Sequence, residues 1–387
     1  MNETIYMPVG EVCSSISDTY REKKNMVTLI NTSDVLEGRV LNHERVPNSN
    51  LKGQFKKTFQ RDDILYSEIR PQNRRFAYVD FSPIDYIAST KLMVIRAKKD
   101  VVSPKYLYYF LKNSSTVAEL QLLAETRSGT FPQITFSEVA NLTIPVPSLA
   151  VQEVIVQTMQ CLEDKITCNE QINDNLQQQA FSVFDNLIAN AENNDYTVSD
   201  YAFLNPKRTL AKNQVARSID MSQLSTSGAF PSGWEMKPFN GGMRFTNGDT
   251  LLARITPCLE NGKTAFIDFL DDGEVAFGST EYIVLAPKND TPPEMLYCLA
   301  RYPAFVDYAV KNMNGSSGRQ RVSAETVGQY RLPLFDKHSL VLFKEVVSPM
   351  FLKMRYNSLE NMRLAELRDA LLPKLMSGEI DVSAVQL

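Results

Sequence analysis

The stretch Asp63-Ile-Leu-Tyr-Ser-Glu-Ile-Arg-Pro71 recurs further along the chain as Asp249-Thr-Leu-Leu-Ala-Arg-Ile-Thr-Pro257. Four other short matches lie at nearly the same separation. They pair residues 31–35 with 220–224, 89–95 with 279–285, 128–129 with 317–318, and 142–145 with 330–333. The 387-residue chain is therefore one repeat of about 188 residues that occurs twice, with small insertions.

Each repeat begins with a β-rich part of roughly 140 residues, a length typical of one domain. Short runs of apolar residues alternate with Gly, Asn, Asp and Pro, which indicates strands joined by turns. We expect helices at 104–112 and 293–301, and strands at 64–69, 76–81, 91–96, 250–255, 264–269 and 281–285. The pattern predicts one compact α+β domain in each repeat.

The second part of each repeat is a helix with a heptad pattern. Its first copy has seam positions Ile155, Met159, Leu162, Ile166, Asn169, Asn173, Leu176, Ala180, Val183 and Leu187. Every seam position of the second copy, from Phe343 to Leu375, lies 188 residues later. Steps of four and three sustained over five heptads favour a coiled coil over an ordinary surface helix. At 1.5 Å per residue, a helix over 152–189 is roughly 57 Å long and can act as a spacer.

Composition and charge exclude several classes of protein. Apolar residues make up 43% and charged residues 22%, as in a folded globular chain. No apolar run is long enough to span a bilayer, the N-terminus lacks a signal-peptide pattern, and the five cysteines form no CxxC. We therefore expect a soluble protein in the reducing cytoplasm. The net charge of −4 is concentrated in residues 148–192, which hold one Lys against seven Asp and Glu, so the two β-rich parts remain free to meet a polyanion.

Two motifs carry a family resemblance. The run Ser128-Gly-Thr-Phe-Pro-Gln-Ile-Thr135, followed by Leu142-Thr-Ile-Pro-Val-Pro147 and a long helix, resembles the end of a target-recognition domain in specificity subunits of type I restriction-modification enzymes. The segment Leu367-Arg-Asp-Ala-Leu-Leu-Pro-Lys-Leu-Met-Ser-Gly-Glu-Ile380 is similar to the last helix and tail of that family. The resemblance covers nearly the whole chain. The second repeat departs from it, with Gly315-Ser-Ser-Gly-Arg-Gln-Arg-Val322 in place of the first run and Phe335 where Pro147 stands.

The resemblance implies a division of the chain into target-recognition domain 1 (1–147), spacer helix 1 (148–192), target-recognition domain 2 (193–336), spacer helix 2 (337–376) and a C-terminal tail (377–387). It implies that each domain reads one half of a bipartite, asymmetric site on double-stranded DNA. The helices, as an antiparallel coiled coil in a pseudo-two-fold arrangement, would set the spacing and dock two methyltransferase subunits. By the same resemblance, the methyltransferase subunits carry S-adenosylmethionine, and restriction subunits can join the complex. The chain itself is expected to hold neither a cofactor nor a metal.

Candidate DNA-binding residues are cations and amides in turns. Arg, Gln and Asn can make paired hydrogen bonds with base edges, and Lys mostly neutralises phosphate. The first repeat offers Lys52, Lys56, Lys57, Arg61, Arg70, Gln72, Asn73, Arg74, Arg75, Arg127 and Thr130. The second offers Arg254, Asn261, Lys263, Asn314, Ser317, Arg319 and Arg321. The alternatives are a solvated basic face and, for Ser128-Gly129, a purely structural turn.

Catalytic patterns are missing from the sequence. A methyltransferase needs a glycine-rich cofactor loop and an Asn/Asp-Pro-Pro-aromatic tetrapeptide, and the one Pro-Pro pair, at 292–293, lacks both flanks. Asp63 with Glu68 faintly resembles a nuclease carboxylate set, but Arg70 stands where a Lys is wanted and Glu68 becomes Arg254 in the repeat. The sequence thus predicts a non-catalytic DNA reader. The alternative is a coiled-coil protein-interaction scaffold that has lost DNA binding, which the pI of 5.5 favours.

The heptads also predict the register of the helix pair. If the helices are antiparallel and fully overlapped, facing seam positions sum to 530, so Asn169 faces Asn361 and Asn173 faces Asn357. Asparagine in an apolar seam costs stability, but an amide opposite an amide can be satisfied, whereas a slip of one heptad sets it against aliphatic side chains. We predict that these four asparagines fix the register. Alternatively, they fray toward solvent or face a bound methyltransferase subunit.

Overall fold

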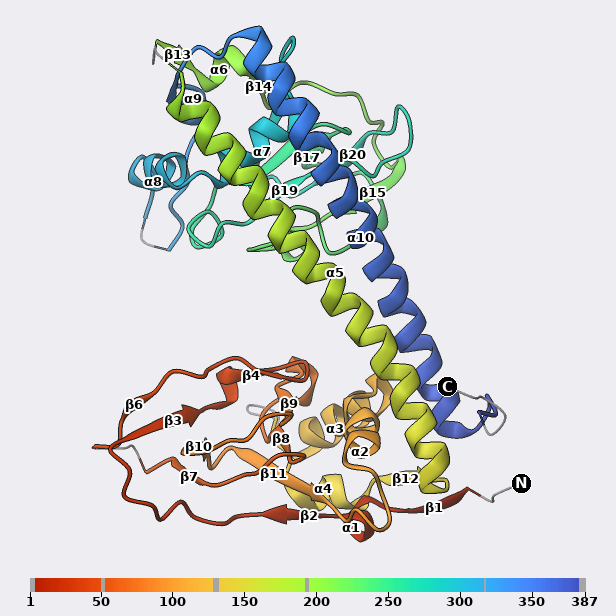
Figure 1. Cartoon of the computed structure of the whole chain (residues 1–387). Coiled ribbons are helices and arrows are strands. Elements are labelled where there is room, and N and C mark those ends of the chain that lie inside the picture. Colours follow the sequence, from red (N-terminus) through yellow and green to blue (C-terminus); the bar gives the residue numbers. More distant parts are fainter. Residues whose placement is uncertain (1–3, 50–52, 128–131, 192–194, 317, 383–387) are drawn as a thin grey trace. The chain divides into compact units, whose positions relative to one another are not determined.

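The computed structural model describes residues 4–49, 53–127, 132–191, 195–316 and 318–382 (Figure 1). Its contacts divide the chain into a first unit, residues 1–163 with 365–387, and a second unit, residues 164–364. Each unit contains one α+β domain and a part of both long helices, α5 (Leu149–Ala189) and α10 (Lys337–Ser377). The two units are described separately.

The first unit contains two four-stranded sheets. One has the order β2 (Cys13–Ile16), β11 (Leu92–Ala97), β8 (Ile64–Ser67) and β9 (Phe76–Tyr78). The other has the order β6 (Val46–Pro47), β3 (Met26–Ile30), β10 (Tyr86–Ser89) and β7 (Phe55–Lys57). Two short pairs are β1 (Ile5–Pro8) with β12 (Thr143–Val146) and β4 (Val35–Leu36) with β5 (Arg39–Val40). The helices are α1 (Val9–Val12), α2 (Pro104–Lys112), α3 (Ser114–Arg127) and α4 (Phe136–Asn141), with a 3-10 turn at Pro71–Asn73.

The second unit has the same strand orders. One sheet is β14 (Ala202–Leu204), β21 (Tyr282–Pro287), β18 (Thr250–Ala253) and β19 (Thr264–Phe266), and the other is β16 (Glu235–Pro238), β15 (Val215–Ile219), β20 (Ala276–Gly278) and β17 (Met243–Phe245). A short pair joins β13 (Tyr196–Thr197) and β22 (Arg331–Leu332). The helices are α6 (Val198–Tyr201), α7 (Pro293–Arg301), α8 (Pro303–Lys311) and α9 (Ala324–Gly328). The β3/β10 and β15/β20 pairs are both parallel, so the two units share a topology as well as a sequence pattern.

The aspartate that opens the repeated stretch has the same role in both units. Asp63 immediately precedes β8, accepts a hydrogen bond from the Gln60 backbone N–H (2.8 Å) and pairs with Arg96 (2.8 Å). Asp249 immediately precedes β18, accepts a hydrogen bond from the Thr246 N–H (2.7 Å) and pairs with Arg208 (2.7 Å). Both carboxylates are buried and are used to close the turn before a strand. This explains why the stretch starts with Asp in both repeats.

The long helices supply core residues to both units. In the first unit, Ile155 and Met159 of α5 share one hydrophobic core with Leu372 and Leu375 of α10 and with Tyr106 of α2. In the second unit the corresponding core joins the last turns of α5 to the first turns of α10, through Ala180, Phe184, Phe343, Val347 and Phe351. Early α5 thus packs with late α10, and late α5 with early α10, as in an antiparallel pair. No helix in the described parts of the chain is long and apolar enough to cross a membrane.

The four seam asparagines meet within the second unit in the pairs that the heptad arithmetic gives. Asn169 Nδ2 donates to Asn361 Oδ1 and Asn357 Nδ2 donates to Asn173 Oδ1, each at 2.8 Å. Asn169 and Asn357 are buried, so they do not fray toward solvent. Asn169 also donates to Glu360 (2.7 Å), a contact that the seam pattern does not predict. The role of these residues in fixing the register stays a prediction.

Candidate nucleic-acid interface

The turn between β8 and β9 carries five of the eleven residues predicted in the first repeat. Arg74 donates to the Ser114 hydroxyl (2.9 Å), and Arg75 donates to the carbonyl oxygens of Ser33 (3.0 Å) and Val35 (3.4 Å). These two arginines are therefore held by their own domain. Arg70 and the neighbouring amides Gln72 and Asn73 are exposed.

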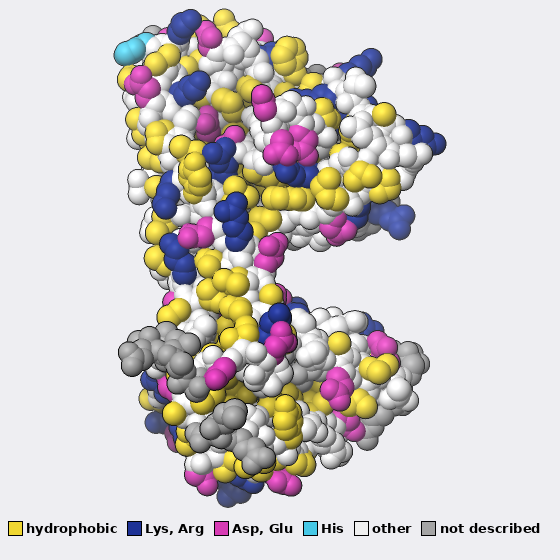
Figure 2. Space-filling model, turned by 90° about the vertical axis from the view of Figure 1, so that its right-hand side faces the viewer, with side chains coloured by type: hydrophobic (Ala, Val, Ile, Leu, Met, Phe, Trp, Pro, Cys, Tyr) yellow, Lys and Arg dark blue, Asp and Glu magenta, His cyan; other side chains and the backbone are white. Residues whose placement is uncertain are grey.

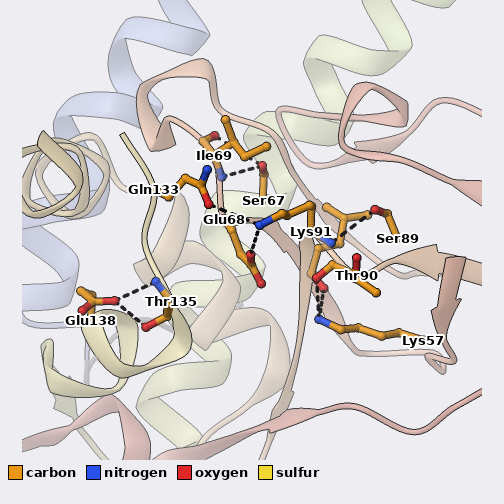
Figure 3. A network of polar contacts seen from close by, with 11 residues as sticks. Lys57, Ser67, Glu68, Ile69, Ser89, Thr90, Lys91, Gln133, Thr135 and Glu138 are labelled. Atoms are coloured by element: carbon orange, nitrogen blue, oxygen red, sulfur yellow. Dashed lines mark hydrogen bonds and ion pairs between the residues drawn. The ribbon is translucent and has the colours of Figure 1, made fainter. Parts of the chain in front are cut away.

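The basic residues that precede β8 differ in how far their side chains are buried. Lys57 is half-buried and donates to the carbonyl oxygens of Thr90 (3.1 Å) and Leu92 (2.7 Å) (Figure 3). Burial lowers its pKa. Lys57 thus ties β7 to the turn before β11, a role that its residue type did not reveal. Lys56 and Arg61 are exposed, and Lys52 lies outside the described residues.

The equivalent turn of the second domain lies between β18 and β19. Asn261 is exposed there, 188 positions after Asn73. Lys263 is turned inward, since its ammonium donates to the Met221 carbonyl at 2.7 Å. Of the three residues predicted in this region, Asn261 presents its side chain most openly, and Arg254 is partly covered.

The loops before the last strand of each domain hold the other predicted residues. Asn314 and Arg321 form a short backbone bridge, with both N–H to carbonyl bonds at 2.9 Å, and Arg319 between them is exposed. Arg321 makes an ion pair with Glu281 (2.8 Å), and hydrogen bonding to Arg321 lowers the pKa of that carboxyl group. The side chain of Arg127, and the residues Thr130 and Ser317, lie outside the described residues.

A polar cluster that the sequence reasoning missed lies where these segments meet. In the first domain, Lys91 lies in the turn before β11 and contacts two side chains (Figure 3). They are Glu68, directly after β8, at 3.5 Å, and Gln133, in the loop before α4, at 3.3 Å. The signal was present in the sequence, since alignment of 89–95 with 279–285 already sets Lys91 against Glu281.

Charged side chains of both signs lie on the surface of the protein. On the face drawn in Figure 2, basic side chains are scattered among apolar and acidic ones rather than gathered into one patch. Among the described residues, no group of three or more His, Cys, Asp and Glu side chains is placed to hold a metal ion. The arrangement offers amides and cations on turns, which is suited to contacting base edges and phosphates.

Comparison with known proteins shows what the chain is similar to. Residues 6–178 match the family model described as "Type I restriction modification DNA specificity domain". The type I restriction enzyme HindI specificity subunit of Haemophilus influenzae is 29% identical, over 92% of this chain and 94% of its own. The MjaIX specificity subunit of Methanocaldococcus jannaschii is 22% identical, over 78% and 76%.

A solved structure supports the fold. The crystal structure of a type I restriction-modification system S subunit from M. genitalium has a TM-score of 0.54 at 16% identity, and the match covers 98% of this chain and 97% of that one. The family model covers the first domain and most of α5, and the second domain repeats the same strand orders. The chain is therefore similar, over most of its length, to the specificity subunits of type I restriction-modification enzymes, and its residues 6–178 match the type I DNA specificity domain.

Proposed function

We propose that this chain is the sequence-reading subunit of a type I restriction-modification complex, and that each of its α+β domains reads one half of a bipartite DNA site. One observation carries the proposal. The two domains share their strand orders but differ in the side chains on equivalent turns, as at Glu68 and Arg254. One scaffold with two sets of contacts suits a site whose halves differ in sequence.

The proposed partners are double-stranded DNA and two methyltransferase subunits, with restriction subunits in the full complex. Apolar side chains on α10 are 43–59% exposed and offer a methyltransferase subunit a surface; they are Val341, Leu342, Val346, Leu352 and Tyr356. Beside them, between the last turns of α5 and the first turns of α10, lies a cavity of about 670 Å³. We place the complex in the cytoplasm, in keeping with the five free cysteines.

We further propose that the chain is not itself an enzyme and that S-adenosylmethionine binds to the methyltransferase subunits. The test measures transfer of a labelled methyl group to duplex DNA by the purified chain, by the methyltransferase subunits and by the two together. Methylation is expected only in the mixture. Transfer by the purified chain alone would overturn this assignment.

DNA binding itself is tested with the purified complex on random-sequence duplex at increasing salt. A DNA reader retains non-specific binding that weakens steeply with salt, because bound phosphates release counterions. A scaffold that has lost DNA binding gives no shifted band at any salt concentration. The latter result would overturn the proposed function.

A further inference from the structure

Two polar clusters occupy equivalent places in the two domains but carry exchanged charges. We call Glu68, Lys91 and Gln133 the first triad, and Arg254, Glu281 and Arg321 the second triad. The backbone establishes the equivalence. The N–H of Glu68 donates to the carbonyl of Lys91, and that of Arg254 to the carbonyl of Glu281, both at 3.0 Å.

The third member of each triad is placed by a matching backbone bond. The carbonyl of Glu68 accepts from the Ile134 N–H at 2.9 Å, and the carbonyl of Arg254 accepts from the Val322 N–H at 3.0 Å. Residues 69 and 133 form an isolated antiparallel bridge, as do residues 255 and 321. One backbone frame therefore holds Glu, Lys and Gln in the first domain and Arg, Glu and Arg in the second.

The side chains of the two triads form different hydrogen bonds and ion pairs. In the first triad the ammonium of Lys91 is the shared group, at 3.5 Å from Glu68 Oε2 and 3.3 Å from Gln133 Oε1 (Figure 3). In the second triad the carboxylate of Glu281 is shared. Arg321 holds it with Nε and Nη2 at 2.8–3.0 Å, while Nε of Arg254 lies 3.4 Å away, outside hydrogen-bond geometry.

The exchange alters what each domain presents to solvent. The first triad is neutral and its most exposed member is Lys91, with half of its side chain accessible. The second triad carries one net positive charge, and the side chains of Arg254 and Arg321 are 33% and 36% exposed. An ammonium is a point charge suited to phosphate, whereas a guanidinium can match the guanine edge. In the second triad Arg321 is held by Glu281 and by the Arg319 carbonyl, so Arg254 is the arginine placed to offer its guanidinium to a ligand. The same backbone frame thus presents an ammonium to the ligand in the first domain and a guanidinium in the second.

We propose that each triad is a specificity-determining cluster that sets the half-site preference of its own domain. The inference rests on the proposed DNA reading. Each triad joins the end of a central strand, the turn before its neighbour and the loop that precedes the last strand. Those segments adjoin the turns that carry Asn73 and Asn261. Exchanging one triad for the other therefore changes the charged side chains beside the turn, while the backbone of the domain stays the same.

The test transplants one triad into the other frame. The full chain, assembled with its methyltransferase subunits, selects from a pool of duplexes with 30 randomised base pairs (roughly three helical turns), and the bound DNA is sequenced. Lys91→Glu alone faces the Glu68 carboxylate and should weaken specific binding about tenfold, on the scale of one lost contact. Glu68→Arg with Lys91→Glu and Gln133→Arg recreates the second triad and should restore binding with an altered first half-site. The reciprocal exchange in the second domain should alter the second half-site.

Two further variants keep the test decisive. Lys91→Arg retains the ion pair with Glu68 and should change the first half-site even if the triple variant fails to fold. Exchanging the exposed pair Glu22 and Lys24, 3.9 Å apart, reverses charges in the same domain and should leave the selected motif unchanged.

The outcomes separate this proposal from the proposed function. If wild type selects no motif, DNA reading itself is wrong. If wild type selects a bipartite motif and the folded Lys91→Arg or triple variant selects the same one, the triads do not determine specificity. A change of both halves to the same extent would also overturn the proposal, because each triad lies within one domain.

Discussion

The four seam asparagines form a nearly symmetrical set within the second unit. The buried amides of Asn169 and Asn357 donate across the pair. The partly buried amides of Asn361 and Asn173 donate to the carbonyl oxygens of Ile166 and Met354, each at 3.4 Å. Asn169 Oδ1 and Asn357 Oδ1 are buried and accept no hydrogen bond within the described structure. Two unsatisfied acceptors lower the stability of the helix pair. We therefore interpret the asparagines as residues that fix the register of the two helices rather than as residues that stabilise the pair.

A double-mutant cycle tests this interpretation. Asn169→Leu removes the donor to Asn361 and should lower the free energy of unfolding by about 1–3 kcal/mol. Asn169→Leu with Asn361→Leu removes both amides of this pair and should recover much of that loss, a coupling of roughly 0.5–3 kcal/mol. Trp234, the one tryptophan of the chain, lies in the second unit and reports unfolding by its fluorescence. Strictly additive effects would show that the two amides do not interact.

Asp249 provides a pH-dependent test at the same scale. Burial raises its pKa from 3.8 to about 6, although Arg208 opposes the shift. The folded protein therefore holds the proton more tightly than the unfolded chain, and the resulting stability, complete below pH 3.8, is lost as the pH rises through 6. Relative to Asp249→Asn, wild type should lose roughly 2–3 kcal/mol between pH 4 and pH 7. Urea unfolding followed by Trp234 fluorescence measures the difference, and a constant difference across that range would contradict the prediction.

Residue types suggested which side chains could contact DNA, but they did not show which of these side chains the domain itself would engage. Arg75 and Lys57 carry the chemistry of a DNA contact, yet both donate to backbone carbonyls of their own domain. Their partners lie more than 30 residues away in sequence, so their identity depends on tertiary structure. The seam asparagines could be paired in advance because helical geometry alone relates their positions.

At the scale of elements, the two long helices are anchored to their domains by different chemistry at equivalent positions. Glu163 of α5 accepts from the Tyr109 hydroxyl (2.8 Å) and pairs with Lys112, whose pKa is lowered by burial. Phe351 of α10, 188 positions after Glu163, packs against Phe266 and Tyr297 with ring centroids 5.2 and 5.5 Å apart. The first anchor is polar and the second is aromatic.

Truncating the two anchors should therefore have unequal effects. Phe351→Ala removes a fully buried ring and should cost about 3–5 kcal/mol, seen as a lower urea midpoint in Trp234 fluorescence. Glu163→Gln keeps the size and a hydrogen-bond acceptor for Tyr109 and should cost about 1–3 kcal/mol, measured by hydrogen exchange of α2 amides. Equal losses would mean that the aromatic anchor is no stronger than the polar one.

Helix limits were the most predictable feature of the elements. The expected helices at 104–112 and 293–301 agree with α2 and α7, because Pro at the first position marks where each begins. The sheet containing β3 and β10 could not be predicted, since its parallel pairing joins residues 28–30 to 86–88. Pairing between strands so far apart in the sequence leaves no local pattern from which it could be predicted.

For the molecule as a whole, the repeat carries the functional argument. Asn73 and Asn261 occupy equivalent exposed turns, one in each unit. If each domain reads its own half-site, Asn73→Ala should relax one half and Asn261→Ala the other, at about 1–3 kcal/mol per lost base contact. The double variant should show the sum, since the two residues share no partner.

Binding of the assembled complex to duplexes altered in one half at a time measures this division of labour. Asn175→Ala, on the exposed surface of α5, is the matched control and should leave both halves unchanged. Relaxation of both halves by Asn73→Ala would show that the domains do not read independently. If neither single variant changes the half-site preference, these two turns do not contact the bases. The triads would then be the better candidates for reading the half-sites. Their side chains differ in charge between the two domains, whereas the turn amides are the same in both.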